Sequence, residues 1–147
     1  MSDHSKLPRP ALPQRTPRLP QRVHLLGAGG AGVSGAALLL HAAGHEVTAN
    51  DRAASEHTRM LAAAGIAVSI GDDEARLPEG VGLLVRSAAV PESDGRVREA
   101  LERGVPVLKY SELLGRITPA GRTLAVAGTH GKTTTSWMLH HALRGLL

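Results

Sequence analysis

From Val23 onward, short apolar runs alternate with segments that have the residue pattern of a helix. Parallel strands need a long crossover connection between them, and a helix is the usual crossover. The alternation therefore predicts an α/β domain built on a doubly wound, Rossmann-like parallel sheet. In such sheets ligands bind beyond the carboxyl ends of the strands. The residues that directly follow each strand are therefore the first candidates for a binding site.

The expected elements have recognisable start and stop signals. A glycine follows each of the first three predicted helices, as is common at helix ends, and Ser55 is a favourable helix N-cap. The predicted strands are Val23–Leu26, Glu46–Asn50, Ala67–Ile70, Gly82–Val85 and Val105–Leu108. The predicted helices run over Ala31–Ala43, from Ser55 to Ala64, from Ser93 or Asp94 to Arg103, and over Glu112–Ile117.

The first glycine-rich loop lies between the first predicted strand and the first predicted helix. Its glycines follow the spacing G-x-G-x-x-G and allow the backbone to approach a ligand closely. Free amides and the helix dipole then favour an anion, and Asp51 is placed to accept hydrogen bonds from a ribose or base. The expected diphosphate-binding residues are Gly27, Ala28, Gly29, Gly30, Ala31 and Gly32. The motif leaves NAD, a UDP-sugar and a turn without ligand all open.

A second glycine-rich loop follows the predicted strand Arg122–Ala127 and precedes a helix predicted from Lys132 to Leu147. Its spacing, G-x-x-G-K-T, is two residues shorter than the standard phosphate-binding loop. Lys132 supplies a positive charge for the β- and γ-phosphates, and the Thr133 hydroxyl is a ligand for Mg²⁺. The expected ATP-binding residues are Gly128, Thr129, His130, Gly131, Lys132, Thr133 and Thr134.

The two loops together define the expected domain organisation. Residues 23–117 form the Rossmann-like domain, and residues 118–147 form the start of an ATP-binding domain, a truncated P-loop strand–loop–helix unit. A dehydrogenase domain has no use for the second loop, and a plain P-loop ATPase has no use for the first. Residues 1–22 are expected to be a disordered tail rich in proline and arginine.

The charge distribution argues against a nucleic-acid partner. Residues 1–22 carry five basic residues and one acidic residue, which equals the net charge of +4 of the whole chain. The remaining 12 basic and 12 acidic residues balance. No run approaches the ~20 apolar residues that span a bilayer, and the absence of cysteine excludes disulfides and thiolate metal sites. We therefore expect a cytoplasmic protein with neither membrane nor nucleic-acid partner.

Four segments resemble the Mur ligases, a family of ATP-dependent amino-acid ligases. They are His24–Gly35, Ser87–Pro91, Lys109–Leu114 and Ala127–Thr135, and the resemblance extends from Val23 to the end of the chain. A histidine at the position of His130 is typical of the alanine-adding member and of its relative, the murein-peptide recycling ligase. Two residues depart from the family pattern, because Ala88 replaces a hydroxyl residue and Lys109 replaces an arginine.

The resemblance implies a three-domain enzyme that joins L-alanine to UDP-N-acetylmuramate in peptidoglycan precursor synthesis. The sugar's carboxylate attacks the γ-phosphate of ATP, and the amine of L-alanine then displaces phosphate from the acyl phosphate. Ser87 joins Gly27–Gly32 and Asp51 in the UDP-sugar site, and Lys132 is the catalytic residue, with ATP and Mg²⁺ as cofactors. The L-alanine site has no counterpart in this chain, which is expected to be inactive alone.

Three alternatives remain open from the sequence. A murein-peptide recycling ligase differs mainly in residues outside this chain. An NAD-binding oxidoreductase domain leaves Lys132 unexplained. A non-catalytic nucleotide-binding module fits a chain that ends at Leu147, one helix after the second loop.

Overall fold

The computed structural model describes residues 19–71, 76–118 and 123–145 of the 147-residue chain. The chain divides after Ile117 into two compact units, which are described separately below. Most of the predicted tail, residues 1–18, lies outside the described residues. Within the described ranges no helix is both long enough and apolar enough to cross a membrane.

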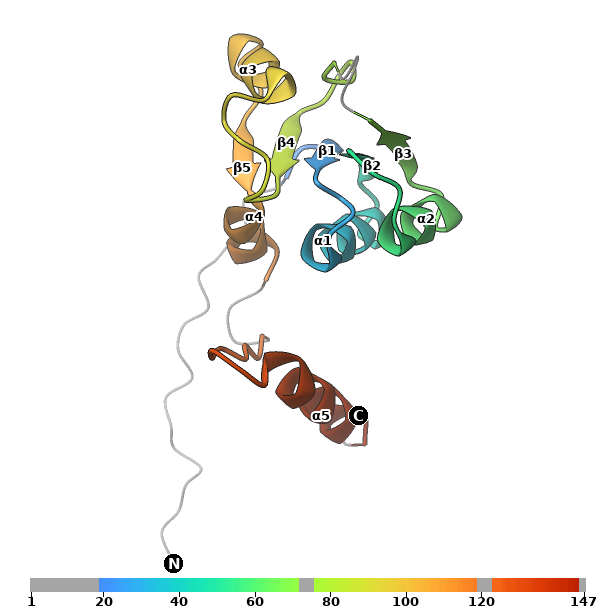
Figure 1. Ribbon diagram of the computed structural model, residues 1–147, viewed down its shortest axis with the longest axis vertical. Helices are drawn as coiled ribbons and strands as arrows, with labels where there is room; N and C mark the ends of the chain where they lie inside the picture. The colour runs from blue at the N-terminus through green and yellow to red at the C-terminus, as the bar shows by residue number, and fades with distance from the viewer. Residues whose placement is uncertain (1–18, 72–75, 119–122, 146–147) are drawn as a thin grey trace, which may run out of the picture. The chain divides into compact units, whose positions relative to one another are not determined.

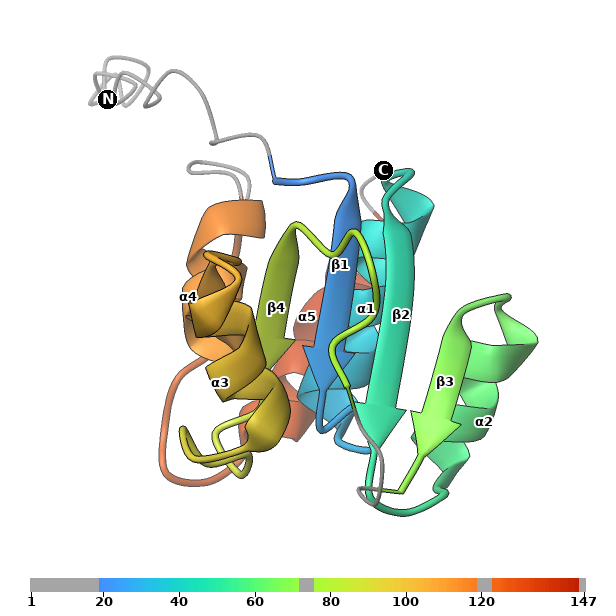
Figure 2. The ribbon, with the colours of Figure 1, turned by 90° about the horizontal axis from the view of Figure 1, so that it is seen from above.

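The first unit is built on a parallel sheet with the strand order β3-β2-β1-β4-β5. Figure 2 shows its arrowheads pointing in the same direction. The strands are β1 (Arg22–Leu26), β2 (Glu46–Asp51), β3 (Ala67–Ile70), β4 (Leu83–Arg86) and β5 (Val107–Lys109). The chain leaves β1 in one direction for β2 and β3, and then returns to the other side of β1 for β4 and β5. This order confirms the predicted doubly wound α/β fold.

Helices cover both faces of the sheet (Figure 1). The helices α1 (Ala31–Ala42), α2 (Glu56–Ala63) and α4 (Tyr110–Ile117) pack on one face, and α3 (Gly95–Glu102) packs on the other. Because successive side chains of a strand point to opposite faces, Leu25 belongs to the core under α1, and Leu26 belongs to the core under α3. Both side chains are fully buried.

Capping explains why α2 begins where predicted. The Ser55 hydroxyl accepts the Thr58 amide at 3.2 Å, and the Thr58 hydroxyl accepts the Ser55 amide at 2.8 Å. This reciprocal pair satisfies two amides that a helix start otherwise leaves without partners.

The end of the predicted tail belongs to the sheet. Arg22 is the first residue of β1, its Nε donates to the Glu46 carboxylate at 2.7 Å, and the Glu46 amide donates to the Gln21 carbonyl. Leu19 packs against the core. The predicted tail, residues 1–22, therefore extends too far. A charged residue such as Arg22 does not fit the apolar pattern of a buried strand, and only the backbone pairing shows that it belongs to β1.

The boundaries around β5 also differ from the prediction. β5 begins at Val107, and α4 follows directly at Tyr110. Val105 instead donates its amide to the Ala100 carbonyl at the end of α3. Because Pro106 has no amide hydrogen, it contributes only its carbonyl, which accepts the Leu84 amide at 2.9 Å.

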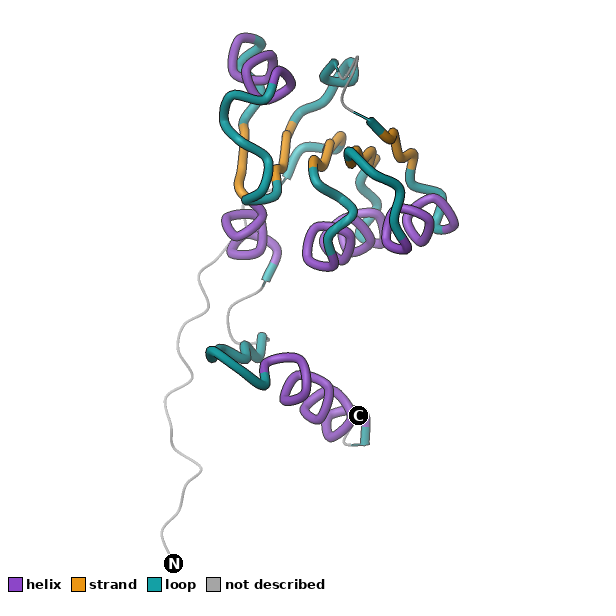
Figure 3. The backbone as a smooth tube through the Cα atoms, in the orientation of Figure 1, coloured by secondary structure: helices purple, strands orange, loops and turns teal. Residues whose placement is uncertain are grey.

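The second unit contains helix α5 (Lys132–Arg144) and the loop before it. The strand predicted over Arg122–Ala127 is wrong for residues 123–127, which form no strand and are drawn as loop in Figure 3. A strand exists only through backbone bonds to a neighbouring strand, and none pairs with this segment among the described residues. Leu124, Val126, Leu139 and Leu143 instead line a shallow hollow of about 280 Å³ beside α5.

The face of the sheet under α3 carries buried polar side chains. His24, in the middle of β1, is only 3% exposed, and its Nδ1 lies 2.7 Å from the Thr48 hydroxyl. Burial, together with the nearby positive charge of Arg96, lowers the pKa of His24 from 6.5 to about 4. His24 is therefore a neutral, packed histidine at neutral pH.

We expect α4 to be an integral part of the first unit's core. Leu113→Ala should lower the free energy of unfolding by about 2–5 kcal/mol, because Leu113 is fully buried. Leu101→Ala is the matched control and should change the stability by less than about 0.5 kcal/mol, since Leu101 is 62% exposed. Urea unfolding should be followed by circular dichroism, because the only tryptophan, Trp137, lies in the second unit. Equal losses for both variants would contradict this packing.

We expect acid to destabilise the first unit through His24. Between pH 6.5 and about pH 4, His24 is mostly protonated in the unfolded chain but mostly neutral in the folded chain. The free energy of unfolding should therefore fall, by up to about 3 kcal/mol, as the pH decreases from 6.5 to 4. Urea unfolding across this range should show a shallower pH dependence for His24→Gln than for His41→Gln, in which an exposed histidine is replaced. Identical pH profiles for the two variants would contradict the assignment.

Candidate functional site

The first glycine-rich loop lies where the sheet reverses its winding. It connects β1 to α1, at the carboxyl end of β1, and β1 is the strand that pairs with both β2 and β4. A cavity of about 350 Å³ opens at this point. Four of the predicted site residues line it, namely Gly27, Gly30, Asp51 and Ser87. The fold therefore brings together residues from three separate strand ends, as the switch point of a doubly wound sheet does.

Other parts of the chain closely approach three glycines of this loop. A Cβ atom at Gly27 would lie 2.6 Å from the Ser87 Cβ, and Gly27 has a φ of +80°. A Cβ at Gly29 would lie 2.8 Å from the Asp51 carboxylate. A Cβ at Gly32 would lie 3.0 Å from the Tyr110 ring. The motif thus serves close packing within the protein as well as access for a ligand.

The expectation that free amides along the whole loop face an anion is wrong for its first four residues, since even the Gly30 amide donates to the Gly27 carbonyl, at 3.4 Å. The Gly27 and Ala28 amides donate to the Asn50 carbonyl at 2.9 and 3.1 Å, and the Gly29 amide donates to the Asp51 carboxylate at 2.6 Å. The amides of Ala31 and Gly32, in the first turn of α1, have no acceptor among the described residues. The start of α1 is therefore the part of the loop suited to a phosphate.

Asp51 has a structural task in addition to its predicted contact with a ligand. One of its oxygens accepts the Gly29 amide, and the other accepts the Ala53 amide at 3.1 Å. A carboxylate has about four lone-pair positions, so these two bonds leave capacity for a hydroxyl group. Asp51 therefore holds the loop and still offers an acceptor on the cavity side.

A buried arginine shapes the turn that carries Ser87. Arg86 donates to the Val90 carbonyl at 2.7 Å and to the Glu92 carboxylate at 2.5 Å, and its side chain is only 8% exposed. The Ser87 hydroxyl accepts the Ala89 amide at 3.3 Å. The turn after β4 is thus held from within, which places Ser87 against Gly27. Arg86 was not among the expected site residues, because it directly follows the predicted apolar strand, where a charged residue usually marks an exposed strand end.

A second buried arginine, Arg96, lies at the start of α3 and is only 4% exposed. Its guanidinium makes two bonds with Asp94, from Nε at 2.9 Å and from Nη2 at 2.8 Å. Hydrogen bonding to Arg96 lowers the pKa of Asp94, which keeps that carboxylate ionised. Arg96 also donates to the Asn50 side chain. Asn50, Asp94 and Arg96 all line the 350 Å³ cavity, and sequence analysis did not assign any of them to the site.

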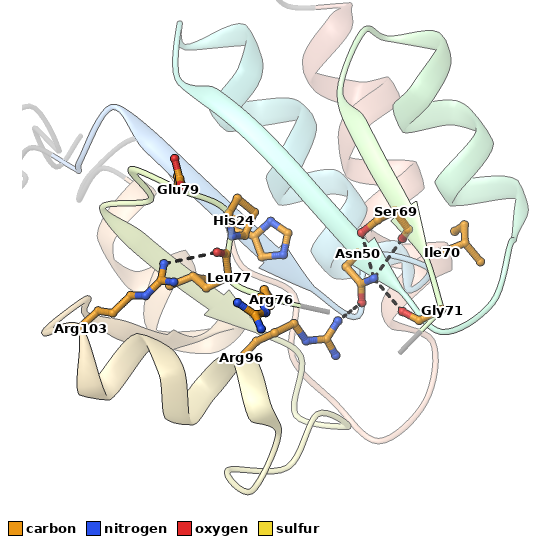
Figure 4. Close-up of a pocket in the computed structure, with 11 residues that line it drawn as sticks. His24, Asn50, Ser69, Ile70, Gly71, Arg76, Leu77, Glu79, Arg96 and Arg103 are labelled. Carbon is orange, nitrogen blue, oxygen red and sulfur yellow. Dashed lines mark hydrogen bonds between the residues drawn. The ribbon is translucent and has the colours of Figure 1, made fainter. Parts of the chain in front are cut away.

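A larger cavity of about 660 Å³ lies on the α3 side of the sheet. Figure 4 shows His24, Asn50 and Arg96 among the side chains that line it. Asn50 and Arg96 also line the smaller cavity. The two cavities therefore share these two residues in their linings.

Neither of the two departures from the family pattern lines the cavity at the glycine loop. Ala88 is exposed on the turn after β4. Lys109, at the end of β5, lines a different hollow of about 360 Å³, and its amide donates to the Glu112 carboxylate at 2.6 Å. Among the described residues Lys109 and Ser87 do not share a cavity.

In the second unit, the predicted ATP loop precedes α5. Gly131 has a φ of +79° and is followed by Lys132, the first residue of the helix. The Lys132 amino group donates to the carbonyls of Gly128 and Thr129 at 2.7 and 3.2 Å, so it lies over the loop. Thr133 and Thr134 occupy the first turn of α5 and are exposed.

The donors for a magnesium ion are sparse in this unit. Mg²⁺ in nucleotide sites is usually held by one or two carboxylates together with substrate phosphates. Residues 118–147 contain neither aspartate nor glutamate, and no group of three metal-binding side chains occurs in the described ranges. The Thr133 hydroxyl is suited to be one of the Mg²⁺ ligands beside the substrate phosphates, but one hydroxyl alone does not form a magnesium site.

Comparison with known proteins supports the geometry of the first unit. A family profile described as "Mur ligase family, catalytic domain" matches residues 22–122. The UDP-N-acetylmuramate–L-alanine ligase of Rubrobacter xylanophilus is 50% identical over 125 residues, which are 85% of this chain and 28% of that protein. The enzyme of the same name from Kineococcus radiotolerans is 48% identical over 83% of this chain and 26% of its own length. The chain thus spans about a quarter of the length of these relatives.

Solved structures agree with the sequence matches. The UDP-N-acetylmuramate-alanine ligase from Thermotoga maritima superposes with a TM-score of 0.75 at 29% identity, over 85% of this chain and 29% of that chain. A murein peptide ligase from Psychrobacter arcticus superposes with a TM-score of 0.73 at 32% identity, over 84% of this chain and 27% of that chain. With a family profile that covers well over half of its residues, and a glycine loop at the switch point of a doubly wound sheet, this chain belongs to the Mur ligase family.

Proposed function

We propose that the first unit binds UDP-N-acetylmuramate, with its diphosphate at the start of α1. The observation that carries this proposal is the convergence of Gly27, Asp51 and Ser87 in one cavity at the switch point. Free amides in the first turn of α1 suit a diphosphate. The remaining acceptor capacity of Asp51 suits a ribose hydroxyl, and the Ser87 hydroxyl provides a further polar contact. Residues 23–117 would therefore form the domain that binds the sugar nucleotide.

The second unit, residues 118–147, is proposed as the start of an ATP-binding domain. The Lys132 amino group lies at the loop that precedes α5, which supports this role, because a lysine at such a loop provides a positive charge for phosphates. Residues Gly128–Thr134 would bind the phosphates, and the Thr133 hydroxyl would contribute to Mg²⁺ binding, which supplies charge neutralisation for phosphoryl transfer.

The proposed reaction of the complete enzyme is the ATP-dependent joining of L-alanine to UDP-N-acetylmuramate. A carboxylate oxygen of the sugar attacks the γ-phosphorus, ADP leaves, and an acyl phosphate forms. The amine nitrogen of L-alanine then attacks the acyl carbon, phosphate leaves, and the nitrogen loses a proton. Lys132 would stabilise the charge on the transferred phosphoryl group. Both nucleotides are made inside the cell, so the proposed compartment is the cytoplasm.

A second candidate function is the ligation of a murein peptide to the same sugar nucleotide. The likeness to the Psychrobacter arcticus murein peptide ligase favours it, because that structure and the alanine ligase superpose on this chain about equally well. The two candidates share the sugar-nucleotide domain and differ in the amine that they accept. We do not expect this chain alone to ligate either amine, since the proposed amine site belongs to the part of the relatives that it does not span.

Titration calorimetry on the 147-residue chain should show binding of UDP-N-acetylmuramate. Gly27→Ala should abolish this binding, because the new Cβ would lie 2.6 Å from the Ser87 Cβ at a φ of +80°. Gly35→Ala is the matched control and should bind normally, since no atom lies within 4 Å of the new Cβ inside α1. Binding of NAD without binding of the UDP-sugar would refute the proposal in favour of an oxidoreductase domain.

We expect MgATP to change the fluorescence of Trp137, the only tryptophan, which lies on α5 and is 65% exposed. Lys132→Met should raise the MgATP concentration at which half of the fluorescence change occurs by about tenfold or more, because a charge-assisted contact to phosphate is lost. Arg144→Met removes one positive charge from the far end of the same helix and should leave the response unchanged. If the fluorescence of Lys132→Met saturated at the same MgATP concentration as that of the wild type, the assignment of an ATP-binding loop would be contradicted.

A further inference from the structure

Arg96 is a buried cation that is fully engaged on one side by Asp94. The Asp94 carboxylate accepts the Arg96 backbone amide at 2.9 Å as well as two bonds from the guanidinium. This arrangement fixes the arginine side chain at the N-terminus of α3. A buried charge is tolerated only when its partners are well placed, and here the partners leave Nη1 directed at the Asn50 side chain.

Asn50 connects Arg96 to the strands on the other side of the cavity. Its side-chain amide donates to the Ser69 carbonyl at 3.2 Å, to the Ser69 hydroxyl at 3.0 Å and to the Gly71 carbonyl at 3.0 Å (Figure 4). Its backbone carbonyl accepts the amides of Gly27 and Ala28. One residue therefore joins the end of β3, the glycine loop and the arginine.

The Arg96–Asn50 bond crosses the sheet at the point where its winding reverses. Asn50 belongs to β2, on one side of β1, whereas Arg96 follows β4, on the other side. The bond therefore links the two halves of the sheet along the wall of the nucleotide cavity. Both residues are almost fully buried, at 3% and 4% exposure, so water competes little with this bond.

We propose that Arg96 is a positioning residue for the nucleotide, acting through Asn50 to hold Gly27 and Ala28 in the conformation that presents the start of α1 to the diphosphate. The proposal rests on the proposed binding of a UDP-sugar at this cavity. Loss of the guanidinium leaves the Asn50 oxygen buried without its donor, which favours reorientation of the asparagine. Reorientation moves the carbonyl that both loop amides share, and the loop loses its preformed shape.

The test combines two measurements on the full 147-residue chain carrying Arg96→Lys or Arg96→Gln. A lysine keeps the charge beside Asp94, but a single ammonium does not span Asp94 and Asn50 together. Calorimetry should show that UDP-N-acetylmuramate binds about tenfold more weakly or worse. Hydrogen exchange of the ligand-free chain should show exchange at Gly27 and Ala28 accelerated about tenfold, while exchange at Leu25 and Leu26 in β1 stays as in the wild type.

Ser69→Ala is the matched control. It removes one acceptor of the same Asn50 amide group but leaves the bond from Arg96 intact. It should therefore retain both the affinity and the slow exchange of the loop amides. A merely structural arginine would instead accelerate exchange in β1 and in the loop alike.

The outcomes separate this proposal from the proposed function. If the wild type does not bind UDP-N-acetylmuramate, the proposed function fails, and the positioning role in binding fails with it, even where the loop amides respond to Arg96. If the wild type binds and both arginine variants match it in affinity and in loop exchange, the positioning role is overturned and the proposed function stands. If both variants fail to fold, by circular dichroism, Arg96 is a structural residue and the proposal is likewise overturned.

Discussion

The pairing of β1 with β2 on one side and β4 on the other is the constraint on which the site depends. Because all three strands are parallel, their carboxyl ends meet at the same edge of the sheet. Gly27, Asp51 and Ser87 follow or end these strands, so residues far apart in the sequence line one cavity. Close packing of Gly27 against Ser87 shows how tightly the strand ends converge.

Around this edge, the protein uses its own polar groups to hold the binding elements in place. Asn50 and Asp51 bind the amides of the glycine loop, and the buried Arg86 binds the carbonyl of the turn that follows β4. Such internal bonds leave the first turn of α1 as the place where an anion finds amides without acceptors among the described residues. The glycine motif is therefore both a packing device and a binding device, and these two roles fall on different residues of the loop.

The second unit contrasts with the first in its packing. Its helix has no fully buried side chain among the described residues, and Trp137 and Met138 are largely exposed. A single helix with a preceding loop has too little apolar surface to form a core of its own.

The sequence by itself determined the α/β class, the order of the elements in the first unit and the position of both loops, because strand and helix periodicity and glycine stops are local signals. It also determined that Ser55 caps α2. The tertiary structure alone decided that Arg22 starts β1 and that residues 123–127 form no strand. It also decided that Asn50 and Arg96 line the site and that Arg86 binds the turn after β4. A strand needs a partner, and a buried arginine needs acceptors from distant segments. Neither condition can be evaluated along the chain, because both depend on residues that only folding brings together.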